Sequence, residues 1–283
     1  MARRGRDMKN IANAVAMGGL WVAAAVTVAV LALILLYVFV NGIGSLSLDF
    51  VFTDPEGVAM EGGIWPTIVA TVYVTGLAML IVTPVAILAA VYLAEYARQG
   101  RLVTVIRFAA DTLASVPSIV MGLFGLSLFV EAMGFGFSML SGALALAFLM
   151  LPIVMRTTEE AIRSVPRYIR WGSYGLGATK WQTVRRSVLP AAAPRIITGI
   201  ILATGRAVGE TAVVIFTMGT MINTPLLPLD PGRSMTVHLY LLAMEGINLP
   251  TAYGTALLLA IMILAFNLAA RWVVRRNRRM GRR

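Results

Sequence analysis

The sequence contains no cysteine and only one histidine, His238. Without cysteine the chain can form neither a disulfide nor a thiolate metal site, and it has no cysteine nucleophile. Zinc sites of the usual kinds need several histidine or cysteine ligands, so a single histidine cannot assemble one. Charged residues are also scarce, at 13% of the 283 positions, whereas a soluble domain usually has about 25%. These shortages exclude thiol and zinc chemistry and disfavour a water-soluble globular domain.

Apolar side chains are abundant instead: 59% of the residues are hydrophobic, and the mean hydropathy is +0.83. This surplus must face something other than water, and lipid is the obvious candidate. A helix needs about 20 apolar residues to cross the ~30 Å hydrocarbon core of a bilayer. The sequence therefore predicts an all-α membrane protein with six transmembrane helices, at residues 15–40, 64–94, 102–130, 137–158, 192–222 and 251–274.

Proline interrupts three of these runs, at Pro84, Pro117 and Pro152. Spanning helices tolerate proline where neighbouring groups satisfy the freed backbone. The first run follows a basic start, as in a signal peptide, but it is longer than the roughly 7–15 apolar residues of a signal sequence. We interpret it as the first spanning helix.

Charge alternates between the segments that connect the runs. The N-terminal segment, the second and fourth connections and the C-terminal tail are basic, whereas the first loop is acidic and has no basic residue. Basic loops mark the cytoplasmic side, so both termini are predicted to be cytoplasmic in a multi-pass protein of the cell inner membrane. The formal net charge of +11 would suggest nucleic acid as a partner of a soluble protein. Its placement here predicts contact with the lipid bilayer and no nucleic-acid partner.

The connection at 157–191 is too long for a simple helix–helix turn and too apolar for a disordered segment. One interpretation is an amphipathic helix on the membrane surface. We divide the chain into residues 1–63 (tail, first helix and first external loop), a core at 64–275 that contains this connection, and a basic tail at 276–283.

Arg206 lies within the fifth run, where an arginine costs at least ~2.5–3.5 kcal/mol unless it faces a polar cavity or a partner. Glu210 is four residues further, the spacing that shares one helix face. The two could form an internal ion pair that fixes helix packing. Alternatively, they could line an oxyanion pathway, because a guanidinium offers planar paired donors. Four neighbours would leave room or add hydroxyl groups there: Gly205, Gly209, Thr204 and Thr211.

Arg156 ends the fourth run, and a snorkelling anchor and a pathway residue are equally good interpretations of it. Glu159 and Glu160 are possible partners for it. Arg107 and Asp111 in the third run have the spacing of an ion pair within one helix, and we expect that pair to be structural.

Two further segments carry weaker signals. Residues 235–244 predict an interfacial or docking helix, with His238 on its polar face. Gly172 to Gly177 have the glycine spacing of a P-loop, but Ala178 and Thr179 stand where lysine and Ser/Thr are needed. ATP must then be hydrolysed by another chain, so we expect no cofactor on this one.

The segment 175–183, followed by Leu189-Pro190, resembles the cytoplasmic loop of ABC importer permeases. In that family a short helix of this loop fits a groove on the ATPase subunit. The family motif usually opens with Glu-Ala-Ala, where this chain has Trp171-Gly172-Ser173. The resemblance implies that these residues dock the ATPase: Gly172, Ser173, Tyr174, Gly175, Leu176, Gly177 (the invariant glycine), Ala178, Thr179, Leu189 and Pro190.

Residues 115–124, 151–159 and 206–212 together look like the A-type permease of the high-affinity phosphate importer, and the match covers about 60–275. The resemblance implies a type I ABC importer permease fold and transport roles for Arg156 and Arg206. It also implies a second permease, two copies of a P-loop ATPase that bind ATP and Mg, and a periplasmic or extracellular phosphate-binding protein. An importer of another oxyanion, sulfate or molybdate, is the alternative.

Two other classes explain less. An intramembrane lipid-phosphate transferase using Arg206 and Glu210 would need a base or a metal cluster, and the scattered carboxylates and lone histidine do not supply one. A membrane scaffold without transport activity would leave Arg206 and the long connection unexplained.

Overall fold

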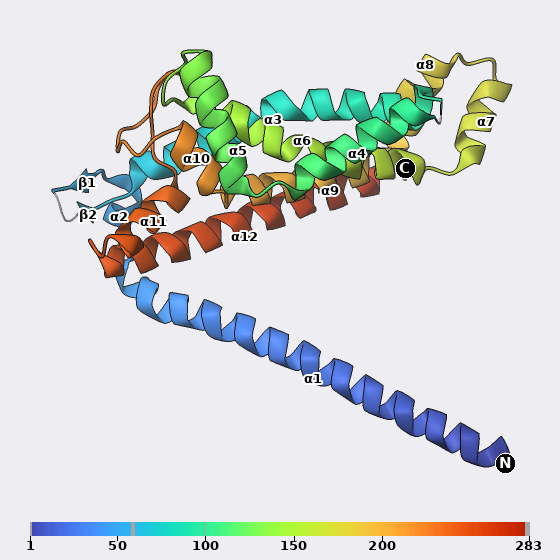
Figure 1. Cartoon of the computed structure of the whole chain (residues 1–283), viewed down its shortest axis with the longest axis horizontal. Coiled ribbons are helices and arrows are strands. Elements are labelled where there is room, and N and C mark those ends of the chain that lie inside the picture. The colour runs from blue at the N-terminus through green and yellow to red at the C-terminus, as the bar shows by residue number, and fades with distance from the viewer. Residues whose placement is uncertain (1, 58–59, 99, 281–283) are drawn as a thin grey trace.

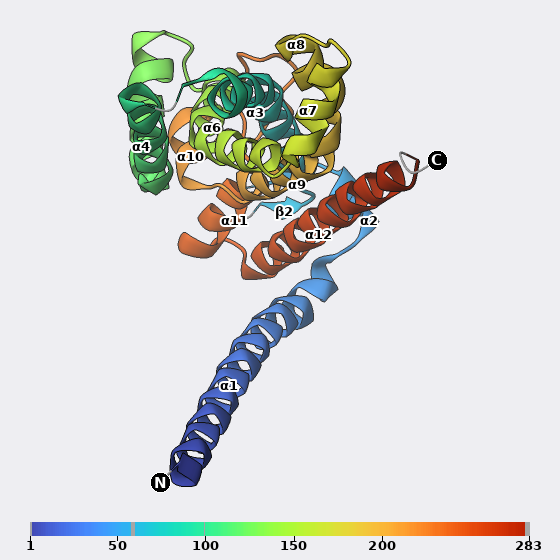
Figure 2. The ribbon, with the colours of Figure 1, turned by 90° about the vertical axis from the view of Figure 1, so that its right-hand side faces the viewer.

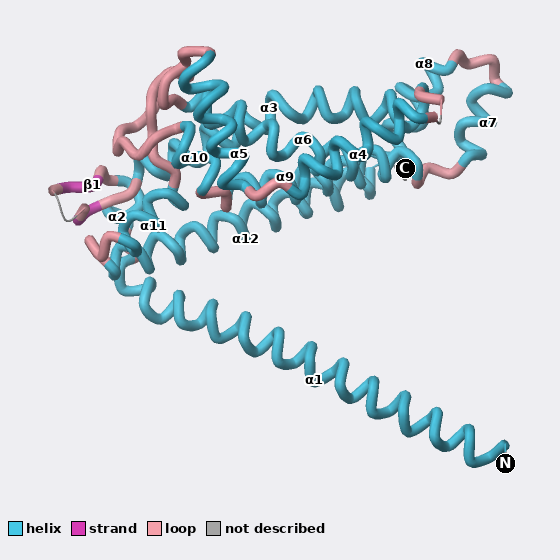
Figure 3. The backbone as a smooth tube through the Cα atoms, viewed as in Figure 1, coloured by secondary structure: helices cyan, strands magenta, loops and turns pink. Residues whose placement is uncertain are grey.

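The structure, a computed structural model of the chain, describes residues 2–57, 60–98 and 100–280. Apart from one small hairpin, its regular elements are helical (Figures 1 and 3). Short 3-10 or π-helical turns extend or join the helices at Ile43–Ser45, Tyr92–Tyr96, Leu126–Ala132 and Val184–Val188. The main elements are α1 (Ala2–Gly42), α2 (Leu48–Phe52), β1 (Pro55–Glu56), β2 (Glu61–Gly62), α3 (Trp65–Val91), α4 (Arg101–Ser115), α5 (Ser118–Gly125), α6 (Met139–Arg163), α7 (Arg167–Gly175), α8 (Lys180–Thr183), α9 (Leu189–Val208), α10 (Ala212–Thr217), α11 (Met235–Met244) and α12 (Leu249–Met280).

Five helices of the described chain are long and apolar enough to cross a membrane, and a bent pair makes up to a sixth. The predicted helical class and the first, second, fourth and sixth spans are thereby confirmed. The fourth span is longer than predicted, because α6 continues through Pro152 to Arg163.

The third predicted span is not one straight helix. α4 and the helix that begins with α5 meet at 100°. Val116 adopts an extended backbone (φ −65°, ψ 131°) directly before Pro117, which begins the next helix as its N-cap. A proline disfavours helical geometry in the residue before it, so the break falls where the sequence places Pro117.

α3 and α6 form the centre of the bundle. One face of α3 is a stripe of small residues at four-residue spacing, all at most 2% exposed: Ala70, Val74, Ala78, Val82, Ala86 and Ala90. Small side chains let two helix backbones approach closely, which drives helix association in a bilayer. Gly142 of α6 illustrates this closeness, since a Cβ atom there would lie 3.2 Å from Val74 Cγ2. This tight core holds the elements of the functional site in place.

The elements that are not spans gather at the two ends of the bundle (Figure 1). β1, β2, α2 and α11 lie at one end, called here the hairpin end, and α7 and α8 lie at the other, called the loop end. α1 leaves the bundle near the hairpin end and extends away from it (Figures 1 and 2). No residue in the most apolar stretch of Ala16–Ser45 is buried by the rest of the chain.

Candidate functional site

α9 turns one face away from the rest of the chain. Thr198, Leu202 and Arg206, which we call the α9 stripe, are exposed at four-residue spacing, whereas Ala203 and Ala207 beside them are buried. In the described part of the chain, no hydrogen bond or ion pair reaches the Arg206 guanidinium. A charge in an apolar span must face a polar cavity or a partner rather than lipid. The α9 stripe is therefore the first candidate for a functional surface.

The predicted pairing of Arg206 with Glu210 on one helix face is wrong. α9 ends at Val208, and Gly209 caps it, so the two side chains do not share a continuous helix. The Glu210 carboxylate instead accepts hydrogen bonds from the backbone amides of Ala212 (3.1 Å) and Val213 (3.4 Å). It thereby satisfies the free N–H groups at the start of α10. The predicted span at 192–222 breaks here because this local bond competes with helix continuation.

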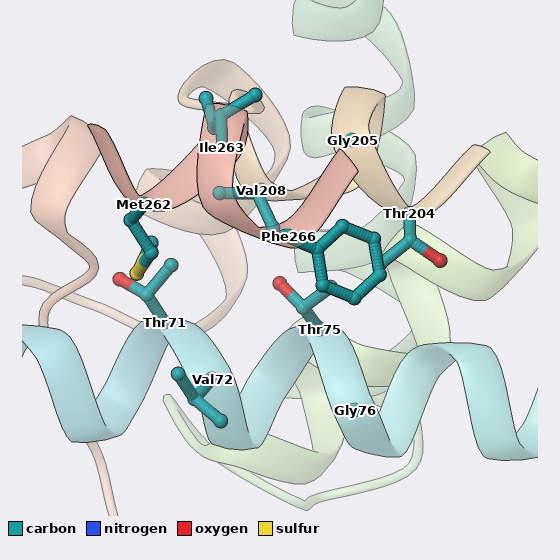
Figure 4. A pocket seen from close by; sticks show the side chains of 10 residues that line it. All are labelled: Thr71, Val72, Thr75, Gly76, Thr204, Gly205, Val208, Met262, Ile263 and Phe266. Carbon is teal, nitrogen blue, oxygen red and sulfur yellow. The ribbon is translucent and has the colours of Figure 1, made fainter. Parts of the chain in front are cut away.

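The two threonines of the predicted site are separated by the same break. Thr211 precedes α10, while Thr204 remains in α9 and donates its hydroxyl to the Ile200 carbonyl at 2.9 Å. Thr204 and Gly205 line a cavity of ≈190 Å³ between α3, α9 and α12 (Figure 4). This cavity is almost wholly apolar. The structure therefore does not gather Thr204, Thr211, Arg206 and Glu210 into one cluster.

Arg156 of α6 has carboxylate partners, unlike Arg206. Its Nη1 donates to Asp111 of α4, and its Nε lies 3.7 Å from Glu160. Glu159, the other suggested partner, instead binds Arg107 (2.8 Å) and Arg163 (2.9 Å). Glu160 is thus confirmed as a partner of Arg156 within α6. Glu159 and Asp111 instead bind arginines across α6 and α4, because antiparallel neighbours bring these positions together.

The predicted docking residues 172–179 lie together on an exposed hairpin formed by α7 and α8 at the loop end (Figure 1). Leu176 at its tip is 91% exposed, which is unusual for a leucine and leaves its side chain available to a partner. Gly177 has φ +79°, a backbone conformation that favours glycine, so it permits the turn between the helices. Thr179 and Gln182 form a reciprocal capping box that starts α8. Leu189 and Pro190 begin α9, three residues before the predicted start of the fifth span.

Three comparisons decide the family. Residues 83–279 match the family described as "binding-protein-dependent transport system inner membrane component". The chain is 37% identical to a probable ABC transporter permease, YqgI of Bacillus subtilis, over 94% of this chain and 96% of that protein. It is 40% identical to the phosphate transport system permease protein PstA 1 of Mycobacterium tuberculosis, over 77% of this chain and 73% of that protein. The chain belongs to the ABC transporter permeases.

Solved structures confirm the predicted importer fold. A bacterial alginate ABC transporter, solved with its alginate-bound periplasmic protein, aligns with a TM-score of 0.67 at 17% identity, over 91% of this permease and 94% of that chain. The inward-facing methionine transporter MetNI aligns with a TM-score of 0.59 at 20% identity, over 75% and 93%. At such low identity these likenesses show the fold alone.

One arginine joins the α7–α8 hairpin of the permease to the bundle by ionic and hydrogen bonds. Arg170 of α7 binds the Glu95 carboxylate through Nε (3.0 Å) and Nη2 (2.5 Å). It also donates to the carbonyls of Val165 (2.8 Å) and Ile162 (3.0 Å). Both charged side chains are at least four-fifths buried. Sequence reasoning missed this pair, although Glu95 directly follows the second apolar run (64–94), which contains no charged residue.

His238 was predicted to lie on a polar face of its helix, and this prediction is wrong. The residue is fully buried in α11. Its Nδ1 lies 3.4 Å from Nη1 of Arg233, whose Nε donates to the Thr220 carbonyl at 2.7 Å. Because a guanidinium can only donate, Nδ1 must accept and the neutral ring carries its proton on Nε2. Burial, and then the charge of Arg233, lower the pKa of His238 to about 4. The ring is therefore a neutral part of the hairpin end.

This environment predicts a pH-dependent stability. Between pH 6.5 and pH 4 the unfolded chain binds a proton at His238 that the folded chain does not bind, so stability falls as the pH drops. We expect a loss of about 2 kcal/mol from this residue between about pH 7.5 and pH 5. His238→Gln should make thermal unfolding in detergent less sensitive over this range. Equal losses in the variant and the wild type would contradict this assignment.

Among the described residues, no group of three or more His, Asp or Glu side chains is placed to hold a metal ion. The groups that can act in the permease are the arginines of α6 and α9 and the hairpin at the loop end.

Proposed function

We propose that this permease forms, together with a second permease, the membrane pathway for inorganic phosphate in an ATP-driven importer. The observation that carries the proposal is the exposed guanidinium of Arg206, which has no partner in the described chain and lies on an apolar spanning helix. Relatives at 33–40% identity are named phosphate transport system permeases. A guanidinium fork fits two oxygens of a tetrahedral oxyanion, and this match of charge and shape supports phosphate as the cargo.

Each site residue has its own role in this proposal. Arg206 offers the anion a free set of donors from the α9 stripe. Arg156 offers a second guanidinium on α6, in competition with its carboxylate partners. Glu210 does not orient Arg206; its carboxylate stabilises the break between α9 and α10. Thr204 and Thr211 flank the break, and Thr211 provides a hydroxyl group beside it.

The partners follow from surfaces that this chain leaves uncovered. The hairpin with Leu176 at its tip would dock one of two P-loop ATPase copies, which bind ATP and Mg. Lipid or the second permease would cover the apolar length of α1, none of which is buried here. The phosphate-binding protein would deliver its anion at the hairpin end.

The topology fits this arrangement. The start of α1 and the end of α12 lie toward the same side as the loop end (Figure 1). Docking of an ATPase there makes both termini cytoplasmic, in agreement with the basic charge of both terminal segments.

The proposal is tested by uptake into liposomes that contain the complete importer with ATP inside and the binding protein outside. Labelled phosphate should accumulate, and unlabelled phosphate should suppress the signal, whereas equal sulfate or molybdate should leave it intact. Accumulation of labelled sulfate or molybdate, with no accumulation of labelled phosphate, would instead assign the permease to that other oxyanion.

A further inference from the structure

Two ion pairs, which we call rungs, join α4 to α6. The buried rung joins Arg107, whose side chain is 30% exposed, to Glu159, whose side chain is 8% exposed and also binds Arg163. The exposed rung joins Asp111 to Arg156, whose side chains are 49% and 61% exposed. The rungs therefore connect the same two helices in very different surroundings.

The difference in burial gives the rungs different strengths. Removing the arginine partner would strand the charge of the buried Glu159 carboxylate, which is strongly destabilising. An exposed pair such as Asp111–Arg156 contributes little, because water screens both charges. The buried rung is thus suited to hold α4 against α6. In the exposed rung, another anion that reaches Arg156 can replace the Asp111 carboxylate at little cost in stability.

The exposed rung also lies inside the span. Arg156 is seven residues before the end of α6, or roughly 10 Å along the helix. Half-exposed charges on a spanning helix face a polar space or extend to the interface, and do not remain in lipid. A cavity of ≈50 Å³ lies between the two helices, lined by both rungs together with Ala110 and Met155. The guanidinium of Arg156 is therefore accessible from a polar cavity.

α4 is attached lightly to the bundle. Val103 is its sole buried residue, and the helix turns away from α5 at 100°. Asp111 thus sits on the less firmly packed of the two helices, while Arg156 sits on the densely packed α6. The cluster around them is neutral overall, with three arginines and three carboxylates: Arg107, Arg156, Arg163, Asp111, Glu159 and Glu160.

We infer that Asp111 competes with the transported oxyanion for Arg156, and that it releases the anion by taking its place. This inference rests on the proposed function. When the anion is bound, Asp111 is displaced and the cluster carries one positive charge free for it. When Asp111 returns, the cluster is neutral again and the anion leaves. Asp111 is thus a positioning residue whose carboxylate sets how long phosphate is held.

Asp111→Asn tests the inference, because it removes the competing charge and keeps the side-chain shape. The purified complex should then bind labelled phosphate up to about fivefold more tightly, the effect of losing a competitor of up to 1 kcal/mol. The maximal rate of uptake should fall, since release is slower. Adding Arg156→Gln should abolish the extra binding. Asp111→Glu should restore wild-type binding and uptake.

A charge swap separates this role from a structural one. Asp111→Arg combined with Arg156→Asp rebuilds the ion pair between α4 and α6 but removes the anion-binding arrangement. If the double variant takes up less phosphate than the wild type, the result supports competition for Arg156. If its uptake equals that of the wild type, the ion pair serves only to hold α4 against α6, and the inference is overturned. This swap also decides the question if Asp111→Asn fails to assemble. If the wild type carries phosphate but Asp111→Asn binds and transports normally, the inference alone fails. If the wild type carries none, the proposed function fails first.

Discussion

Replacing Arg206 by glutamine is expected to lower phosphate uptake at least about a hundredfold while the importer remains assembled. Each hydrogen bond to a charged group contributes about 1.5–3 kcal/mol, and loss of a two-pronged contact removes two of them. Assembly should survive, because Arg206 makes no hydrogen bond or ion pair within the described chain. The measurement is uptake of labelled phosphate by liposomes that contain equal amounts of purified complex.

Arg206→Lys is the matched control for this variant. Lysine keeps the charge but lacks the planar fork, so uptake should be intermediate between the wild type and Arg206→Gln. Normal uptake in Arg206→Gln would remove Arg206 from the pathway. Loss of the complex itself would instead indicate that the guanidinium holds the two permeases together.

Placing a charge at the tip of the docking hairpin should release the ATPase subunit. Leu176 is 91% exposed, so Leu176→Asp disturbs no packing within this chain. If the leucine is buried against the ATPase, its loss removes about 1.5–3 kcal/mol of apolar burial, and the new carboxylate adds a desolvation cost. The expected weakening is at least about tenfold. It is measured as the fraction of ATPase that remains with the permease during purification.

Leu226→Asp serves as the control. Leu226 is 81% exposed in the connection between α10 and α11, away from the α7–α8 hairpin, and its replacement should leave the ATPase bound. Gly177→Asp should act like Leu176→Asp for an additional reason, since φ +79° strains any side chain there. Full retention of the ATPase by both loop variants would exclude docking at this hairpin.

The sequence predicted those parts of the permease that depend on local patterns. Apolar length located the spans of α3, α6 and α12, and the apolar composition of 157–191 indicated a folded connection and not a disordered one. The break after Val208 was not visible, because Gly209 and Glu210 stand in an apolar run. The break is stabilised by hydrogen bonds that the first α10 amides donate to the Glu210 carboxylate. These bonds depend on the turn itself, so no local pattern announces them.

The partners of the charged residues were the least predictable feature. Spacing within one helix pairs Arg107 with Asp111, but the neighbouring helix supplies Glu159 and Arg156 instead. Such pairs depend on the register between α4 and α6, which no local pattern encodes. His238 was misplaced for a similar reason: α11 is apolar around its circumference, so periodicity could not identify a buried face.

The absence of cysteine makes one measurement especially direct, because a single cysteine introduced on the α9 stripe is the sole thiol of the permease. With a cysteine-free partner permease, Leu202→Cys should react with a charged, water-soluble thiol reagent, and phosphate should slow the reaction. Leu33→Cys, on the exposed apolar face of α1, should stay unreactive in lipid. If Leu202→Cys is as inert as Leu33→Cys, the α9 stripe faces lipid or a dry interface, and Arg206 does not line a phosphate pathway.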